Sequence, residues 1–296
     1  MQNRVRIEID PPGVADVCLV RGDKMNALDF EMFDALAAAI TRLKTEPGLR
    51  AVVLHGEGKA FCAGLDMGRM ARIGAGEPGG VRDLTPRTHG IANSPQYLGL
   101  GWRELPVPVI AALHGVAFGG GLQLALGADI RLVTAECKMS VMEIKWGLVP
   151  DMAGVALMRG LVRDDHAREL CYTGRVVLGD EAVALGLATR VCADPLAEAR
   201  ALAYAMAQRS PSALRADKRL MNLASRTLDD SAAALLMAES VEQVALMGAA
   251  HQLEAVRANL EKRAPVFAPF PSQGEGLTPT PALPLAGGGS KTSNAA

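Results

Sequence analysis

The stretch GGGLQLALGADIRLV, residues 119–133, places three adjacent glycines before a short run of helix formers and then a β-branched run. Glycine loses more backbone entropy on folding than any other residue, so three in a row need a physical reason. A tight turn at which another group closely approaches the bare backbone supplies one. We therefore expect a strand, a glycine turn, a helix that carries Gln123 as its first polar side chain, and a second strand.

The regions around this stretch repeat the same order of strand, loop and helix. Apolar and alternating runs predict an edge strand and then three buried strands, at residues 4–9, 17–20, 50–56 and 106–115. Asp29 is a candidate N-cap for a helix that ends before Pro47. The recurring order favours parallel α/β winding over an antiparallel sandwich. Residues 68–90 hold many glycines without a clear period, which predicts a surface loop and the start of a helix.

The chain divides into three parts by composition. Residues 1–195 contain the strands and form the expected α/β core, while residues 196–268 read as helices, at 196–209 and 230–262, with a break at Ser210-Pro211. From Pro269 to the end, prolines and glycines are too frequent to build a core, so residues 269–296 are expected to be a disordered tail.

Bulk composition excludes several classes of protein. The 296 residues are 49% hydrophobic and 21% charged, with a formal net charge of −1, so the basic surface of a nucleic-acid or membrane-surface protein is missing. The five cysteines are scattered without CxxC spacing, which is typical of reduced thiols in a cytoplasmic protein. No apolar signal segment or membrane span is evident.

Two glycine motifs resemble nucleotide-binding loops but lack the necessary context. GAGEPG at 74–79 has no preceding strand and contains Pro78, and GGGSKT at 287–292 has Ser290 where a phosphate loop needs glycine. The five histidines form no HExxH motif and no cluster, so no metal site is expected.

Two glycine turns, AFCAGLD at 60–66 and AFGGGLQLA at 117–125, each follow an apolar strand and precede a helix. Backbone N–H groups at such turns point outward, and the helix dipole adds positive charge there. Two N–H groups that converge on one oxygen form an oxyanion hole, and removing one such donor costs about 2.7–4 kcal/mol of transition-state stabilisation. The plainer interpretation is tight packing of strand against helix, which would explain either turn alone.

These turns resemble the crotonase family, also called the enoyl-CoA hydratase/isomerase family. The resemblance runs from about Val5 to Phe267 and rests on AFCAGLDM, HGVAFGGGLQLALGADIRLV and MEIKWGLVPDMAG, in that order. It implies a spiral core of ββα turns with a C-terminal helical layer that mediates trimerisation. It also implies an acyl-CoA thioester as the substrate, no metal or other cofactor, and a homo-oligomer that is a trimer or a dimer of trimers.

The resemblance also assigns binding residues by position. The oxyanion donors would be the N–H groups of Ala63 and Gly120. The residues at the CoA end, with the last two supplied by this chain or by a neighbouring subunit, would be Lys24, Ala63, Leu65, Asp66, Lys262 and Phe267. Cys62 has no positioned histidine base, so we interpret it as packing.

The acid–base residues depart from the typical hydratase pair of glutamates. Glu143 matches one of them, but Gln123 stands at the other, and an amide cannot give or take a proton at neutral pH. Asp151, eight residues after Glu143, resembles the second acid of the dienoyl-CoA isomerase branch, although a turn-forming aspartate after Pro150 is an equal interpretation. We therefore expect a catalytic set of Glu143, Asp151 and Gln123 that isomerises an unsaturated acyl-CoA. The alternatives are a hydratase with one glutamate replaced, a catalytically degraded acyl-CoA binder, and an RNA-binding member of the fold.

Overall fold

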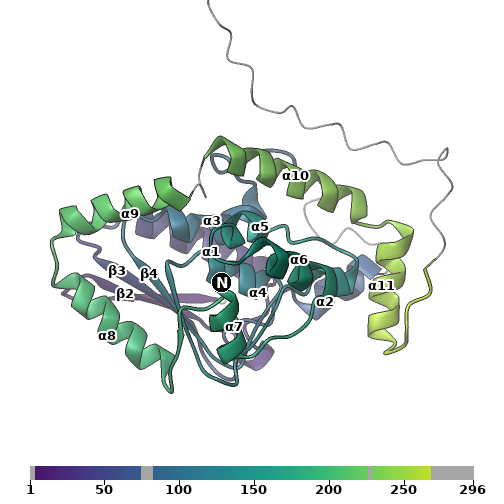
Figure 1. Cartoon of the computed structure of the whole chain (residues 1–296), viewed down its shortest axis with the longest axis horizontal. Coiled ribbons are helices and arrows are strands. Elements are labelled where there is room, and N and C mark those ends of the chain that lie inside the picture. The colour runs from purple at the N-terminus through teal and green to yellow at the C-terminus, as the bar shows by residue number, and fades with distance from the viewer. Residues whose placement is uncertain (1–3, 75–82, 226–228, 268–296) are drawn as a thin grey trace, which may run out of the picture.

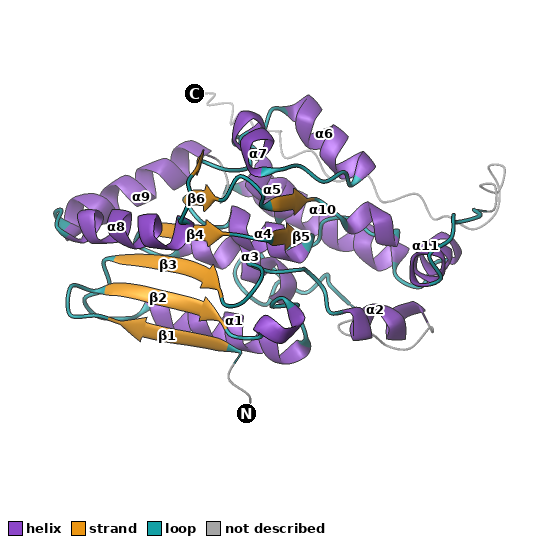
Figure 2. Ribbon diagram, turned by 90° about the horizontal axis from the view of Figure 1, so that it is seen from below, coloured by secondary structure: helices purple, strands orange, loops and turns teal. Residues whose placement is uncertain are grey.

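The computed structural model describes residues 4–74, 83–225 and 229–267. Its main sheet has six strands in the order β1-β2-β3-β4-β6-β8, and β5 and β7 form a second, two-stranded sheet (Figure 2). The strands are β1 (Val5–Ile9), β2 (Val14–Leu19), β3 (Ala51–Gly56), β4 (Val109–Leu113), β5 (Val116–Phe118), β6 (Ile130–Val133), β7 (Lys138–Ser140) and β8 (Arg190–Val191). Only β1 pairs antiparallel, with β2; the other neighbours in both sheets are parallel. The predicted edge strand and parallel α/β class are therefore confirmed.

Helices cover both faces of the main sheet. They are α1 (Phe30–Lys44), α2 (Met67–Gly74), α3 (Ser94–Glu104), α4 (Gly120–Leu126), α5 (Gly154–Met158), α6 (Asp164–Thr173), α7 (Gly179–Leu185), α8 (Pro195–Ala207), α9 (Pro211–Ser225), α10 (Asp230–Leu246) and α11 (Ala250–Leu260). A small core joins α8, through Ala199, Ala203 and Ala207, to one face of the sheet. The larger core joins α1, α3 and α4 to the other face. Strand β3, buried at every position, lies between these two cores.

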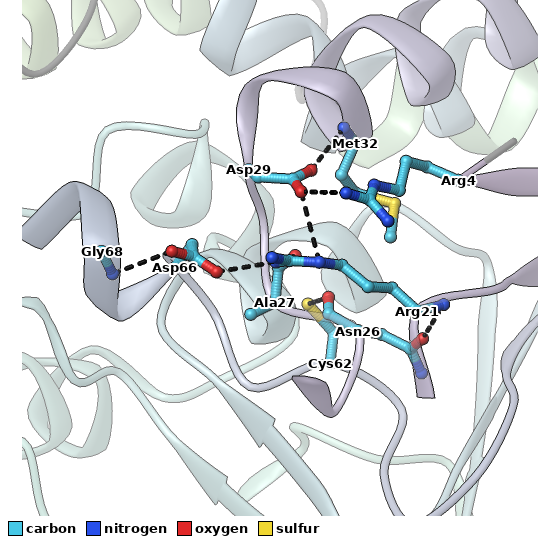
Figure 3. Close-up of polar contacts among 9 residues, drawn as sticks. All are labelled: Arg4, Arg21, Asn26, Ala27, Asp29, Met32, Cys62, Asp66 and Gly68. Atoms are coloured by element: carbon cyan, nitrogen blue, oxygen red, sulfur yellow. Dashed lines mark hydrogen bonds and ion pairs between the residues drawn. The ribbon is translucent and has the colours of Figure 1, made fainter. Parts of the chain in front are cut away.

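The predicted start of α1 is confirmed in detail. Asp29 has an extended backbone and its carboxylate accepts the Met32 N–H at 2.8 Å, which is the N-cap geometry. The same carboxylate pairs with Arg4 at 2.7 Å and with Arg21 at 3.2 Å (Figure 3). The cap therefore also fixes the ends of β1 and β2 against the first helix.

Two regions differ from the sequence-based expectation. Residues 67–74 are the helix α2 rather than loop, and α3 begins after Asn93, whose side chain and that of Gln96 form a capping box. The segment expected to be helical over 230–262 is split at Gly248, which has a φ of +78° and separates α10 from α11. The break at Ser210-Pro211 is confirmed as the start of α9. The expected tail at 269–296 and most of GAGEPG lie outside the described residues, as does GGGSKT.

The helices after β8 do not form a separate unit. In Figure 1, α10 runs along the upper edge of the molecule and leads to α11, which packs beside α2 and the 3-10 turn η2 (Glu143–Trp146). Among the described residues, no single helix is long and apolar enough to cross a bilayer, and α10 with α11 reach that length only as a pair bent by 75°. This C-terminal layer therefore closes over the region where the two glycine turns lie.

Candidate active site

The two glycine turns lie side by side. The Cys62 N–H donates to the Val116 carbonyl at 3.0 Å, and the Phe118 N–H donates back to the Cys62 carbonyl at 3.1 Å. This short parallel pairing sets the turn at 62–66 against the start of α4. A Cβ atom added to Gly64 would lie 3.7 Å from the Gly120 nitrogen, so the two turns meet at the residues expected to form an oxyanion hole.

The donor expected from the first turn was placed at the wrong residue. The Ala63 N–H donates to the Met25 carbonyl at 2.9 Å, so it is not available to a ligand. Leu28 forms hydrogen bonds to the residues on either side of Leu65. Its N–H donates to the Gly64 carbonyl at 2.8 Å, and its carbonyl accepts the Asp66 N–H at 3.2 Å. In a parallel bridge of this kind the N–H of the middle residue faces the other way. No hydrogen bond in the described part of the chain uses the Leu65 N–H, which makes Leu65 the free donor of this turn.

In the second turn, the expected donor Gly120 remains the candidate. It is the first residue of α4, so its N–H is among those that no helical carbonyl can accept, and no described partner takes it. The residue before it, Gly119, has a φ of +50° and a ψ of −121°, a conformation open essentially to glycine alone. A Cβ on Gly121 would lie 2.4 Å from the Cys62 carbonyl oxygen. The three glycines thus allow the two turns to pack closely, and they also place the Gly120 N–H as a donor. The packing and the functional interpretations are therefore compatible.

The first turn is held by a partly buried charge network (Figure 3). Arg21 donates to the Asp66 carboxylate at 2.7 Å, and the Gly68 N–H donates to its other oxygen at 2.8 Å. Although burial favours the neutral acid, the hydrogen bonds from Arg21 and Gly68 lower the pKa of Asp66. The buried Cys62 thiol donates to the Asn26 carbonyl, and burial raises its pKa to about 12. Cys62 is therefore a packing residue and not a nucleophile.

A cavity of about 980 Å³ opens onto both donors. It is lined by both turns and by parts of α1, α2, η2 and the end of α10, and its wall includes Lys24, Ala63, Leu65, Asp66, Gly120, Glu143 and Asp151. Lys262 and Phe267 do not line it: they follow α11, and the Phe267 ring lies 5.5 Å from the His251 ring in an edge contact. Within this chain, those two residues are outside the cavity. No group of three or more His, Cys, Asp or Glu in the described ranges is arranged to hold a metal ion.

Glu143 projects from η2 into this cavity. Its side chain is buried, and its Oε1 accepts the Gln123 Nε2 at 2.6 Å. Its Oε2 is buried without a hydrogen-bond partner among the described residues. Burial, and secondarily the charge of Asp151, raise the pKa of Glu143 to about 7. A carboxylate with one free oxygen and a pKa near neutrality is suited to general-base catalysis.

Gln123 is held so firmly that it acts as a positioning residue. Its Oε1 accepts two backbone N–H groups, from Met152 at 2.9 Å and from Gly154 at 2.8 Å, while its Nε2 is directed at Glu143. These partners fix the orientation of the amide. Gln123 therefore orients Glu143 and the turn at 152–154, and its amide transfers no proton.

Asp151 lies in the wall of the same cavity, partly exposed to it. Burial raises its pKa to about 6, against the opposing effects of a hydrogen bond from Gln243 and the positive charge of Arg69. Asp151 therefore follows Pro150 in a turn and also faces the site, so the two interpretations of this residue are compatible.

Sequence reasoning missed three residues near these acids. Arg69 of α2 lines the cavity, with its guanidinium carbon 4.1 Å from the centre of the Phe30 ring. Glu239 and Gln243 are buried on α10, one helical turn apart. The only sequence signal for these two was their i,i+4 spacing on α10, a helix that carries other polar residues as well, among them Ser240 and Glu242.

Comparisons with known proteins show which family the chain belongs to. The family model described as enoyl-CoA hydratase/isomerase matches residues 10–269. The chain belongs to this family, whose members act on CoA thioesters. A Thermus thermophilus protein with the provisional name enoyl-CoA hydratase is 35% identical over 271 residues, which cover 88% of this chain and all of that protein.

Two further relatives differ in their named reactions and sources. The mitochondrial Delta(3,5)-Delta(2,4)-dienoyl-CoA isomerase of Dictyostelium discoideum is 27% identical, covering 87% of this chain and 88% of that protein. The crystal structure of an enoyl-CoA hydratase/isomerase from Mycobacterium paratuberculosis superposes with a TM-score of 0.74 at 27% identity, covering 87% of this chain and 98% of the other. The crotonase fold is thereby established, while the named reactions of the relatives include both hydration and isomerisation.

Proposed function

We propose that this enzyme isomerises the double bonds of an unsaturated acyl-CoA, with Glu143 and Asp151 as the two proton-transferring groups. The observation that carries the proposal is that two carboxyl groups with raised pKa values line one cavity. The position expected for a hydratase's second glutamate is instead an amide bound to Glu143. Proton transfer between separated carbons needs two such groups, and neither a metal nor another cofactor enters the proposal.

The first step is formation of an enolate. The thioester oxygen accepts hydrogen bonds from the N–H groups of Leu65 and Gly120, both of which lack described partners. Negative charge that develops on this oxygen is stabilised by these fixed donors, which makes the α-proton acidic enough for a carboxylate to remove. The Glu143 carboxylate, in the wall of the cavity, takes that proton.

The second step returns a proton to the far end of the conjugated system. In a 3,5-dienoyl-CoA, loss of the α-proton gives an extended dienolate whose charge reaches the sixth carbon. Protonated Asp151 donates its proton to that carbon, and the electron pairs shift to give the 2,4-dienoyl-CoA. Glu143 ends protonated and Asp151 ionised, so proton exchange with solvent restores the starting state.

Hydration is the second candidate, because the Thermus thermophilus relative and the Methylglutaconyl-CoA hydratase of Homo sapiens carry that name. The Homo sapiens protein is 33% identical over 191 residues. In this alternative, Glu143 alone would activate water beside Gln123. We expect this reaction to be slow, because a well-placed second acid–base group contributes about 10²–10⁴ in rate.

A substrate panel tests the proposal. Purified enzyme is given 2-enoyl-, 3-enoyl- and 3,5-dienoyl-CoA, and products are identified by mass and ultraviolet spectrum. We expect conversion of the dienoyl substrate to dominate and to fall about 10²-fold or more in Asp151→Asn. Dominant addition of water to the 2-enoyl substrate would instead establish the hydratase. Binding of all three without any product would indicate an acyl-CoA binder.

A further inference from the structure

The segment that carries Asp151 has a backbone that needs outside support. Ala153, two residues after Asp151, has a φ of +67° and lies in the left-handed region. A non-glycine residue in this region is strained by roughly 1–2 kcal/mol and keeps that conformation only when its surroundings enforce it. The neighbours of this turn should therefore show what enforces it.

Side chains from two helices hold consecutive N–H groups of this segment. From α4, the Gln123 Oε1 accepts the N–H groups of Met152 and Gly154. From α10, the Glu239 Oε2 accepts the N–H of Ala153 at 3.2 Å. One turn further along α10, the Gln243 Oε1 accepts the N–H of Val149 at 3.1 Å.

The α10 side of this arrangement is buried and braced. Glu239 is only 6% exposed and Gln243 only 4%. The Gln96 side chain of α3 donates to the Glu239 Oε2 at 3.3 Å and to the Leu236 carbonyl at 2.6 Å, which fixes the Glu239 carboxyl relative to its own helix. Glu239 makes no ion pair with the described residues, although the positive charge of Arg87 acts on it. Burying an acid in this way is costly, so the position of Glu239 calls for a role.

We propose that Glu239 is a positioning residue for Asp151: its carboxyl holds the Ala153 N–H and thereby keeps the Asp151 side chain directed into the acyl-CoA cavity. The inference rests on the proposed function, in which Asp151 is the proton donor. Gln243 supports the same segment from its other end, at Val149. The C-terminal helical layer, expected to mediate trimerisation and to supply Lys262 and Phe267 to the CoA end, thus also supports the Asp151 segment.

The neutral form of Glu239 is the form that acts. Burial raises the pKa of Glu239 to about 8, so the acid is mostly protonated near neutral pH. The charge therefore does not matter for the role, whereas an oxygen at the position of Oε2 does. Glu239→Gln keeps that oxygen and its length, while Glu239→Ala removes it and Glu239→Asp withdraws it by one methylene.

The test compares two reactions of one enzyme. Isomerisation of a 3,5-dienoyl-CoA needs both Glu143 and Asp151, whereas exchange of the α-proton with heavy water needs Glu143 alone. In Glu239→Ala we expect kcat for isomerisation to fall about 10- to 100-fold with an unchanged KM, because small misplacements have effects of this size. The rate of α-proton exchange should change by less than about threefold, and Glu239→Gln should restore most of the lost kcat.

A double-mutant cycle gives the decisive comparison. In an Asp151→Asn background, Glu239→Ala should cause no further loss, since the group it positions is already gone. Ser240→Ala is the matched control: Ser240 is buried beside Glu239 but has no described hydrogen bond to residues 149–154, so kcat should be unchanged. Glu239→Asp, which keeps the carboxyl but withdraws it by one methylene, repeats the test with an expected loss of about tenfold in kcat.

Three results would overturn the inference. The first is an undiminished kcat for isomerisation in Glu239→Ala. The second is that Glu239→Ala lowers this kcat equally in the wild-type and the Asp151→Asn backgrounds, and the third is that it lowers isomerisation and α-proton exchange by the same factor. A different result would overturn the proposed function itself, namely Asp151→Asn with undiminished isomerisation. The two failures are therefore distinguishable.

Discussion

At the scale of single residues, one hydrogen bond determines how Glu143 can act. The Gln123 amide occupies Oε1 of Glu143 at 2.6 Å and leaves Oε2 buried without a described partner. Because the Gln123 oxygen is itself taken by two backbone N–H groups, its NH₂ is the group left to face Glu143. The carboxylate is thus oriented by a neighbour that cannot take its proton.

Gln123→Glu should change the chemistry while keeping the geometry. One oxygen of the new carboxyl can still accept the N–H groups of Met152 and Gly154, and the other would lie against Glu143. Two carboxyls in contact share a proton, which raises the pKa of Glu143 further. We expect hydration of a 2-enoyl-CoA to rise about tenfold or more, measured as loss of enoyl absorbance. Unchanged hydration would show that the amide is not what limits this reaction.

The pH dependence follows from the two acids. The productive state has Glu143 ionised and Asp151 protonated, and it is the minor of the two singly protonated forms because the pKa of Asp151 is the lower of the two. The pKa of Asp151 is raised to about 6 and that of Glu143 to about 7, and the two titrate as a pair. Isomerisation should therefore fall as the pH drops below the lower value, where both acids are protonated and the base is lost. It should also fall as the pH rises above the higher value, where both are ionised and the acid is lost.

A control variant separates the two limbs of this pH profile. The residual activity of Asp151→Asn should depend only on ionised Glu143, so its decline at high pH should disappear while the decline at low pH remains. A profile of kcat against pH measures both enzymes. A decline at high pH that persists in Asp151→Asn would contradict the assignment of Asp151 as the acid.

At the scale of elements, the contact of the two glycine turns is what creates the site. Gly64 has a φ of +85°, and a Cβ there would lie 2.5 Å from the Phe118 carbonyl oxygen. Gly64→Ala must therefore push the first turn away from the second and separate the Leu65 N–H from the Gly120 N–H. We expect kcat to fall by about 10²-fold or more, the cost of losing an oxyanion donor.

Gly48→Ala is the matched control for this prediction. Gly48 has a φ of +75°, and a Cβ there would meet nothing within 4 Å. The substitution should cost roughly 1–2 kcal/mol of unfolding free energy, measured by urea denaturation, and leave kcat unchanged. Similar kcat losses in the two variants would mean that backbone strain, and not the contact of the turns, explains the Gly64 result.

Many of the helices and strands could be predicted from the sequence. Buried β-branched runs predicted β3 and β4, and Asp29 predicted the start of α1, because periodicity and caps are local signals. The oxyanion donor of the first turn could not be predicted, because Ala63 and Leu65 differ in a tertiary contact: the Ala63 N–H donates to the Met25 carbonyl, whereas the Leu65 N–H has no described partner. Glu239 was missed for a related reason: its partner, Ala153, is 86 residues away in the chain.

At the scale of the whole molecule, the C-terminal helices have two faces with different environments. The inner face of α10 holds the Asp151 segment, whereas α9 exposes Leu220, Met221 and Leu223, the last of them 76% exposed. Exposed apolar side chains grouped on one helix are a feature of interaction surfaces. They support our proposal that the enzyme is a homo-oligomer, either a trimer or a dimer of trimers.

Sedimentation equilibrium tests this proposal. We expect a mass of three or six chains, and a lower mass for the variant with both Met221→Glu and Leu223→Glu, because charge disfavours burial of this surface. Arg6→Glu, an exposed charge change on β1, is the control and should leave the mass unchanged. A monomeric wild-type enzyme would contradict the proposal.

The most direct test of the central claim is exchange of the α-proton of a saturated acyl-CoA in heavy water, followed by mass spectrometry. Leu65 and Gly120 should stabilise the enolate and Glu143 should carry the proton, whatever double-bond chemistry follows. Wild-type enzyme should incorporate deuterium, and Glu143→Gln should do so about 10²–10⁴-fold more slowly with acyl-CoA binding retained. No incorporation by the wild type, or equal rates in the two proteins, would contradict the account.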